Sequence, residues 1–274
     1  RVDGAHRVKR RADSLLAEQG LAPSREQAQR LIMAGRVYVG EVRVDKPAQL
    51  LPPDAQLVLR GELEQFASRG AHKLEKALRH FEADVQGLDC MDIGAASGGF
   101  TDVLLRAGAA RVYAIDVGYG QLDWRLRQDD RVVVMERTNA RALTPEQFPD
   151  HPTLTVMDVS FISIRLILPA AAAIMGSEGR FLTLVKPQFE AGRGQVGKHG
   201  VVREADTHER VLREIRDFCP TIGWHAAGFT YSPIKGPKGN IEFLADIRPG
   251  AGTSPDDDAI AAVVAQAHAE LHKA

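Results

Sequence analysis

Two segments of this 274-residue chain carry the residue types of a site for a nucleoside-containing cofactor. A glycine-rich run, residues 94–100, directly follows an apolar stretch at 88–93, and the next apolar stretch ends in a carboxylate at Asp116. Glycines let the backbone turn tightly under a ligand, and a carboxylate at the end of the following strand can accept hydrogen bonds from ribose hydroxyls. We therefore expect the cofactor to bind where these two strands end.

The order of the glycines narrows the choice of cofactor. Gly94 is followed by Gly98 and Gly99, so the G-x-G-x-x-G fingerprint of dinucleotide sites is not met, and S-adenosylmethionine (SAM) is favoured. The residues expected to contact it belong to the turn, to the end of the next strand and to the loop after the third: Gly94, Ser97, Gly98, Gly99, Phe100, Asp116, Val117 and Asn139.

Four ionisable residues stand at the ends of predicted elements: Lys73, Asp158, Lys186 and Glu242. Open α/β sheets bind their ligands outside the carboxyl ends of the strands, where Asp158 and Lys186 are expected. Glu242, at the start of the last strand, reaches that edge only if the sheet ends in a reversed strand. Each charge alone is typical of a solvated element end, but the four together favour a catalytic site.

Methyl transfer from SAM needs a nucleophile, and a ribose hydroxyl is a poor one until its proton is removed or shared. An amine can take that proton when burial and a neighbouring cation lower its pKa. Lys186 close to Lys73 would provide the two cations, Asp158 could hold the ammonium group, and Glu242 could orient the second lysine or the hydroxyl.

Other acceptors leave different sequence marks. Enzymes that methylate exocyclic amines usually carry Asn-Pro-Pro-Tyr or Asp-Pro-Pro-Tyr after the fourth strand, where this chain has Asp158-Val159-Ser160-Phe161. Methylation of pyrimidine carbon 5 needs a cysteine nucleophile, and neither Cys90 nor Cys219 is suitably placed. Oxygen methylation remains the best fit.

Alternating strands and helices after residue 88 predict a mainly parallel sheet with helices on both faces. Strands are expected at 88–93, 111–116, 132–135, 154–158, 181–185, 224–231 and 241–248. The last two are joined by the short link 236–240, which fits only antiparallel neighbours. A final helix, which Asp256–Asp258 would begin, is expected to pack on the core.

The first 60 residues predict a smaller α+β unit. Helices are expected at 12–19 and 25–34, the second beginning after the N-cap residue Ser24, followed by a hairpin around Gly40-Glu41 and a strand at 57–59. Residues 1–60 hold 11 Lys and Arg against 7 Asp and Glu, whereas the whole chain has a net charge of −1. This unit is the candidate RNA-binding surface, although a solvated basic tail is the commoner explanation of a charge run.

The composition excludes several other classes of protein. Two cysteines far apart fit a reducing cytoplasm better than a disulfide framework, and the histidines show no metal-ligand spacing. The longest apolar stretch, 166–175, is half the length of a membrane span and contains Pro169. We expect a cytoplasmic protein without a metal and without a membrane segment.

Several of these segments resemble known families. The first unit resembles the αL RNA-binding module of a small-subunit ribosomal protein, some pseudouridine synthases and tyrosyl-tRNA synthetases. Lys73, Asp158, Lys186 and Glu242 resemble the Lys-Asp-Lys-Glu tetrad of FtsJ-like ribose 2′-O-methyltransferases. The segments 68–73, 116–122, 136–141, 158–163 and 185–190 are similar to those of the TlyA family.

The resemblance implies a Rossmann-like SAM-dependent methyltransferase that modifies cytidine 2′-hydroxyls in large-subunit rRNA, and in some members small-subunit rRNA. Such proteins often carry the name haemolysin. The expected domains are an αL-type module at 1–61, a linker at 62–67 and the methyltransferase at 68–274. The linker departs from the mycobacterial members, with Glu64-Gln65-Phe66-Ala67 in place of Arg-x-Trp-Val. Contacts with RNA are expected from Arg11, Arg25, Arg30, Arg36 and Lys46.

Two alternatives stay open at this stage. A pure RNA-binding or ribosome-assembly protein could retain a vestigial cofactor pocket, and SAM binding would distinguish it from an enzyme. A membrane-active haemolysin would need an exposed amphipathic or spanning segment. The glycine-rich segment 191–200 is either a flexible connector or a lid that closes on RNA.

Overall fold

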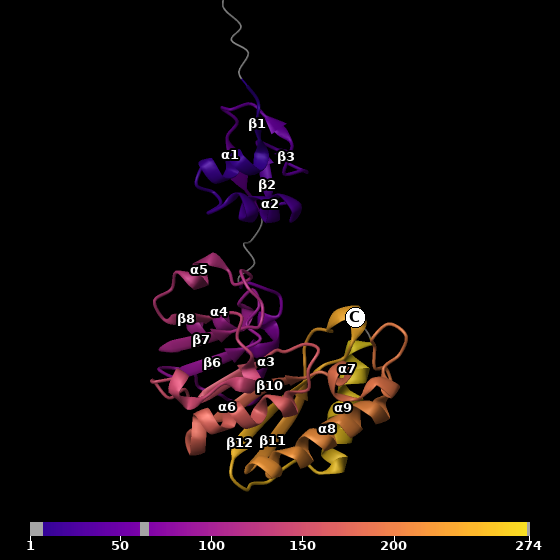
Figure 1. Cartoon of the computed structure of the whole chain (residues 1–274). Coiled ribbons are helices and arrows are strands. Elements are labelled where there is room, and N and C mark those ends of the chain that lie inside the picture. The colour runs from indigo at the N-terminus through magenta and orange to yellow at the C-terminus, as the bar shows by residue number, and fades with distance from the viewer. Residues whose placement is uncertain (1–7, 61–65, 273–274) are drawn as a thin grey trace, which may run out of the picture. The chain divides into compact units, whose positions relative to one another are not determined.

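The computed structural model describes residues 8–60 and 66–272, which belong to two compact units (Figure 1). The first unit contains the described residues up to Arg60, and the second begins at Phe66. The expected linker, 62–67, lies largely outside the described residues. Its last two residues belong to the second unit, where the Ala67 amide donates a hydrogen bond to Asp102 Oδ2 at 2.8 Å.

The first unit has the two predicted helices. Helix α1, Ala12–Glu18, is followed by Gly20, whose φ of +72° suits the left-handed conformation of a helix end. Helix α2, Arg25–Met33, begins after Ser24, whose hydroxyl accepts a hydrogen bond from the Gln27 amide. The helices and the hairpin at Gly40 confirm the sequence prediction.

Short strands complete this unit. Strands β2 (Val37–Val39), β3 (Val42–Arg43) and β5 (Leu57–Leu59) form one antiparallel sheet in the order β3-β2-β5. Strands β1 (Arg10–Arg11) and β4 (Leu50–Leu51) form a second pair that the sequence did not predict. Apolar residues of both helices and the strands, among them Leu16, Ile32 and Val37, make a separate small core.

The second unit is built on a seven-stranded sheet in the order β11-β12-β10-β9-β6-β7-β8. Its strands are β6 (Asp89–Ile93), β7 (Arg111–Ile115), β8 (Val132–Met135), β9 (Leu154–Met157), β10 (Arg180–Val185), β11 (Trp224–Tyr231) and β12 (Phe243–Pro249). The first five are parallel, whereas β12 runs antiparallel to both β10 and β11. The predicted sheet with a reversed strand is therefore confirmed.

Helices cover both faces of this sheet because its central strands are apolar on both sides. In β6, Cys90 packs in one core cluster and Met91 in the other. Helices α3 (Ala71–His80), α4 (Gly99–Arg106) and α5 (Trp124–Arg127) cover one face, and α6 (Leu168–Met175), α8 (Ala205–Phe218) and α9 (Asp257–Leu271) the other. Packing of α9 on the core confirms that prediction.

Short elements connect the strands and helices. Helix α7 (Pro187–Glu190) follows β10 directly. The 3₁₀ helices are η1 (Ala140–Ala142), η2 (Pro145–Gln147), η3 (Ile164–Leu166), η4 (Gly176–Glu178), η5 (Arg193–Gln195), η6 (Cys219–Ile222) and η7 (Pro237–Gly239).

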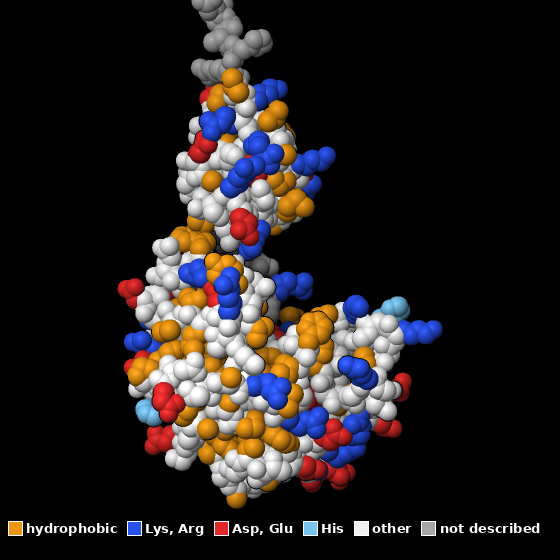
Figure 2. All heavy atoms as spheres, viewed as in Figure 1, with side chains coloured by type: hydrophobic (Ala, Val, Ile, Leu, Met, Phe, Trp, Pro, Cys, Tyr) orange, Lys and Arg blue, Asp and Glu red, His pale blue; other side chains and the backbone are white. Residues whose placement is uncertain are grey.

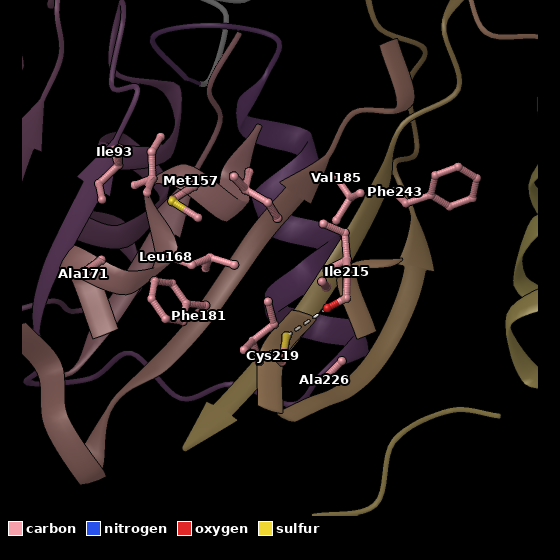
Figure 3. Packing of buried hydrophobic residues seen from close by; sticks show 14 of the residues in the cluster. Ile93, Met157, Leu168, Ala171, Phe181, Val185, Ile215, Cys219, Ala226 and Phe243 are labelled. Carbon is pink, nitrogen blue, oxygen red and sulfur yellow. Dashed lines mark hydrogen bonds between the residues drawn. The ribbon is translucent and has the colours of Figure 1, made fainter. Parts of the chain in front are cut away.

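The larger core lies under α6, α8 and α9 (Figure 3). Phe181 and Phe243 are fully buried there, and the Cys219 thiol donates a hydrogen bond to the Ile215 carbonyl at 3.2 Å. Burial raises the pKa of the Cys90 and Cys219 thiols to about 12, so both are poor nucleophiles. Among the described residues, no helix is long and apolar enough to cross a membrane.

One buried histidine makes the stability of the second unit depend on pH. His208 of α8 is fully buried and contacts the Val202 carbonyl and His268 of α9. Burial lowers its pKa from 6.5 to about 4. Between these values the unfolded chain binds a proton that the folded chain does not, so this group reduces stability as the pH falls from about 6.5 towards 4.

We predict that His208→Gln removes this part of the acid sensitivity. The wild type should lose up to roughly 3 kcal/mol more unfolding free energy than the variant between pH 7 and pH 4. Urea unfolding followed by circular dichroism measures this difference, and the exposed His199→Gln is the matched control. Parallel pH profiles for wild type and His208→Gln would contradict the prediction.

Candidate active site

The turn after β6 fits closely against the neighbouring strand end. Gly94 has φ +83°, and a Cβ added to it would lie 2.2 Å from the Asp158 carbonyl oxygen, so no larger residue fits there without a shift. Gly98 precedes α4 with φ +99°, and its α-carbon faces Leu122 and Leu126. The glycines are therefore needed for the shape of the turn.

The carboxylate after β7 holds this turn in place. Asp116 Oδ2 accepts a hydrogen bond from the Ala96 amide at 2.8 Å, and Oδ1 accepts one from the Gly118 amide at 2.7 Å. Each carboxylate oxygen has a further lone pair. Asp116 thus connects the two loops and can still accept hydrogen bonds from a ligand.

A cavity of about 370 Å³ opens beside Asp116. This volume lies within the range of small-molecule sites, and its walls are mostly apolar with a few polar groups. Of the residues predicted to bind the cofactor, the structure brings together Gly94, Asp116, Val117 and Asn139 around this cavity. Its size and lining fit a nucleoside-containing cofactor such as SAM.

Three of the four remaining predicted cofactor residues line a smaller cavity. Ser97, Gly99 and Phe100 line a cavity of about 50 Å³, which shares Gly94, Ala96 and Asp158 with the larger one. Gly98 lines neither of these two cavities. Two of the predicted residues, Gly94 and Asp116, thus combine a place in the larger cavity with a structural role in the turn.

The four tetrad residues form two ion pairs. Lys73 Nζ of α3 lies 2.7 Å from Glu242 Oε1, and Lys186 Nζ lies 2.5 Å from Asp158 Oδ1. Glu242 is fully buried, and each lysine is only 7% exposed. Burying charges is costly unless they are paired. These pairs therefore compensate the buried charges of Lys73, Lys186 and Glu242, while the Asp158 side chain is 26% exposed and lines the larger cavity.

Strand register explains why residues so far apart in the sequence meet. Val185 at the end of β10 pairs with Phe243 at the start of the antiparallel β12. The residues just beyond this pair, Lys186 and Glu242, consequently lie at the same edge of the sheet. Asp158 reaches this edge from the end of the parallel β9.

Three further residues contribute to the site, although no role was predicted for them. The Ser160 hydroxyl accepts a hydrogen bond from Lys186 Nζ at 3.2 Å, and Gln188 Nε2 donates one to Glu242 Oε2 at 2.8 Å. Phe161 lines the larger cavity, is 90% exposed and has a φ of +65°, which is unusual for an aromatic residue. Ser160 and Phe161 belong to segment 158–163, and the similarity of that segment to the TlyA family was the sequence signal that could have identified them.

In the first unit, a buried carboxylate fixes two of the predicted RNA-binding arginines. Asp13 is fully buried and accepts hydrogen bonds from Arg11 at 2.8 and 3.0 Å, Arg25 at 3.1 Å and Gln29 at 2.9 Å. These donors hold the pKa of Asp13 well below its usual range. The Arg11 and Arg25 side chains remain about half exposed and can contact a phosphate.

The other predicted RNA-binding residues are less constrained. Arg30 pairs with Glu26 one helical turn earlier at 2.9 Å, and Lys46 is exposed. Arg36 donates a weak hydrogen bond to the Arg60 carbonyl at 3.4 Å. Lys and Arg side chains are spread over the visible face of this unit (Figure 2).

Comparison with known families and proteins agrees with this geometry. Residues 66–247 match the FtsJ-like methyltransferase family, and residues 10–57 match the S4 domain. A putative rRNA methyltransferase, YqxC of Bacillus subtilis, is 48% identical over 96% of this chain and 95% of its own length. The 16S/23S rRNA (cytidine-2′-O)-methyltransferase TlyA of Mycobacterium tuberculosis is 46% identical over 87% of this chain and 89% of its own length.

A solved structure shares the whole architecture. The putative hemolysin from Streptococcus thermophilus is 48% identical, with a TM-score of 0.75 over 97% of this chain and 98% of that protein. Family matches, curated relatives and fold therefore agree, and the chain belongs to the TlyA-like group of FtsJ-like methyltransferases with an N-terminal S4 domain.

Proposed function

We propose that this protein transfers a methyl group from SAM to the ribose 2′-hydroxyl of a cytidine in large-subunit rRNA, with small-subunit rRNA as a second candidate substrate. The observation that carries the proposal is the two lysine–carboxylate contacts at the carboxyl edge of the sheet, one of which includes Asp158 of the larger cavity. Related proteins that are named rRNA (cytidine-2′-O)-methyltransferases support cytidine in rRNA as the acceptor. A protein acting on ribosomal subunits would work in the cytoplasm.

Asp158 joins the expected cofactor site to the lysine pairs, because it lines the larger cavity and contacts Lys186. SAM, when bound, supplies a methyl group that is open to attack by a nucleophile. Lys186 Nζ accepts the proton of the 2′-hydroxyl as a neutral amine, after losing its own proton to solvent, and Asp158 stabilises the ammonium group that results. Ser160 fixes the direction of the same side chain.

The second ion pair, between Lys73 and Glu242, positions the acceptor hydroxyl. Glu242 is held by Lys73 and Gln188, so its carboxylate cannot rotate freely. Rigid placement of the hydroxyl in line with the methyl carbon supplies much of the rate in such transfers. Phe161, an exposed aromatic ring at the cavity, is suited to stack on the target base and hold its ribose in place.

The base assignment is tested by Lys186→Ala. We expect methyl transfer to fall by about 10²- to 10⁴-fold, because a general base contributes that much, while the affinity for SAM stays nearly unchanged. Lys186→Arg keeps a positive charge but cannot accept a proton, so it should be as inactive as Lys186→Ala. Single-turnover methylation of rRNA gives the rates, and Arg79→Ala on the surface of α3 is the control. Near-normal turnover in Lys186→Arg would contradict the assignment of Lys186 as the general base.

The cofactor assignment is tested by Asp116→Ala. Loss of the carboxylate removes acceptors for the ribose and two hydrogen bonds that order the loops. We expect SAM affinity to fall about ten- to a hundredfold, which corresponds to about 1.5–3 kcal/mol. Isothermal titration calorimetry measures it, with Asp258→Ala in α9 as the control. Equal affinity in wild type and Asp116→Ala would exclude this site.

We further propose that the first unit binds rRNA through the arginines that Asp13 fixes. Replacing both Arg11 and Arg25 with Ala should weaken rRNA binding. It should also lower the slope of log affinity against log salt by about 1–2 units, because each phosphate contact contributes roughly 0.7–0.9 units to that slope. SAM affinity should not change. Arg43→Ala is the control, since Arg43 pairs with Asp45 on the surface. An unchanged salt slope in the double variant would show that these arginines do not contact phosphates.

A further inference from the structure

A separate cavity, of about 250 Å³, lies in the methyltransferase unit away from the cofactor site. Its walls come from the segment before α8, from the segment before β12 and from the C-terminal end of α9, near the end marked C in Figure 1. It shares no lining residue with the cavity beside Asp116. No role has been assigned to it so far.

This cavity is lined by basic side chains, although the Glu204 carboxylate lies close enough to act on the pKa of His268, which it raises. Arg203, Lys235 and Lys238 line it, and none of its lining residues is an Asp or Glu. Within the described residues, none of these three side chains forms an ion pair or a side-chain hydrogen bond, although Glu204 adjoins Arg203 in the sequence. Most of the other cations of this unit are paired with carboxylates. Three unpaired cations around one hollow are the arrangement expected for binding an anion.

Histidines also line the cavity. His208 Nε2 lies 3.0 Å from the Val202 carbonyl oxygen, which has no proton, so the neutral ring must donate from Nε2. Its Nδ1 then accepts from His268 Nε2, 2.8 Å away. Burial lowers the pKa of both rings, which favours their neutral forms, and Arg203, Lys235 and Lys238 supply the fixed positive charge of the cavity.

The cavity is also held in a fixed shape. Asn240, which is 2% exposed, accepts a hydrogen bond from the Val202 amide at 3.0 Å and donates to the Gly200 and Pro237 carbonyls at 2.9 and 3.1 Å. One side chain thus ties together the two segments that carry the cations. Lys238 has a φ of +57°, a strained conformation of the kind that collects at functional sites.

The cavity adjoins the active site through the backbone. Ile241 lines it, and the next residue, Glu242, contacts Lys73. An RNA strand with its target ribose at Lys186 carries a phosphate at every nucleotide on either side. We propose that this basic cavity binds a backbone phosphate of the substrate RNA close to the target nucleotide, an inference that rests on the proposed function.

The test uses the full-length double variant Lys235→Gln/Lys238→Gln and a control that removes two positive charges elsewhere, Arg79→Gln/Arg213→Gln. Unmodified 23S rRNA is the probe, and affinity is measured over a range of salt concentrations. We expect the cavity variant to bind rRNA about tenfold more weakly and its salt slope to fall by about one unit, as for one lost phosphate contact. Its SAM affinity and its methylation rate at saturating rRNA should match the wild type, and the control should bind normally.

Three outcomes separate the possibilities. A cavity variant that behaves like the control would overturn the proposal. Inorganic phosphate binding, measured by calorimetry, that is lost in the variant while rRNA affinity is unchanged would assign the cavity to a free phosphate compound and overturn the RNA assignment. Absence of ribose methylation by the wild type would reject the proposed function itself, and the binding experiment does not depend on that result.

Discussion

The register between β10 and β12 is the constraint on which the site depends. These strands are antiparallel, and Val185 pairs with Phe243. The residue after Val185 and the residue before Phe243 therefore lie at the same edge of the sheet. Lys186 and Glu242 meet there for that reason. A shift of one residue would turn the side chains of β12 to the opposite face, so the two core clusters that fix its burial pattern also fix the active site.

A second contact joins the chemistry to the cofactor. The Asp158 carbonyl lies where a side chain on Gly94 would be, and the Asp158 carboxylate holds Lys186. Backbone and side chain of one residue therefore touch both halves of the site. Asp116 also connects two parts of the site, because its two carboxylate oxygens accept hydrogen bonds from the two loops that form the cavity wall. Little reorganisation is then required when the reactants bind.

Much of this arrangement could be predicted from the sequence because local patterns carry it. Apolar runs gave the seven strands, glycines marked the turns, and the short link 236–240 indicated the reversed strand. Other features depend on contacts between distant segments. Strands β1 and β4 have two residues each, too few for a periodic pattern, and Asp13 would be expected on the surface of a helix rather than buried under arginines. Gln188 acts through Glu242, 54 residues later, and no spacing rule indicates this.

The basic cavity has no local sequence pattern for the same reason, since its cations come from two distant segments, one before α8 and one before β12. The central claim, however, concerns the acceptor atom. The most direct measurement is mass spectrometry of nucleosides from unmodified rRNA after incubation with the purified protein and SAM carrying a deuterated methyl group. The account predicts the label on the ribose of 2′-O-methylcytidine and on no base. Label on a base, or no label with a fully folded protein that binds SAM, would contradict it.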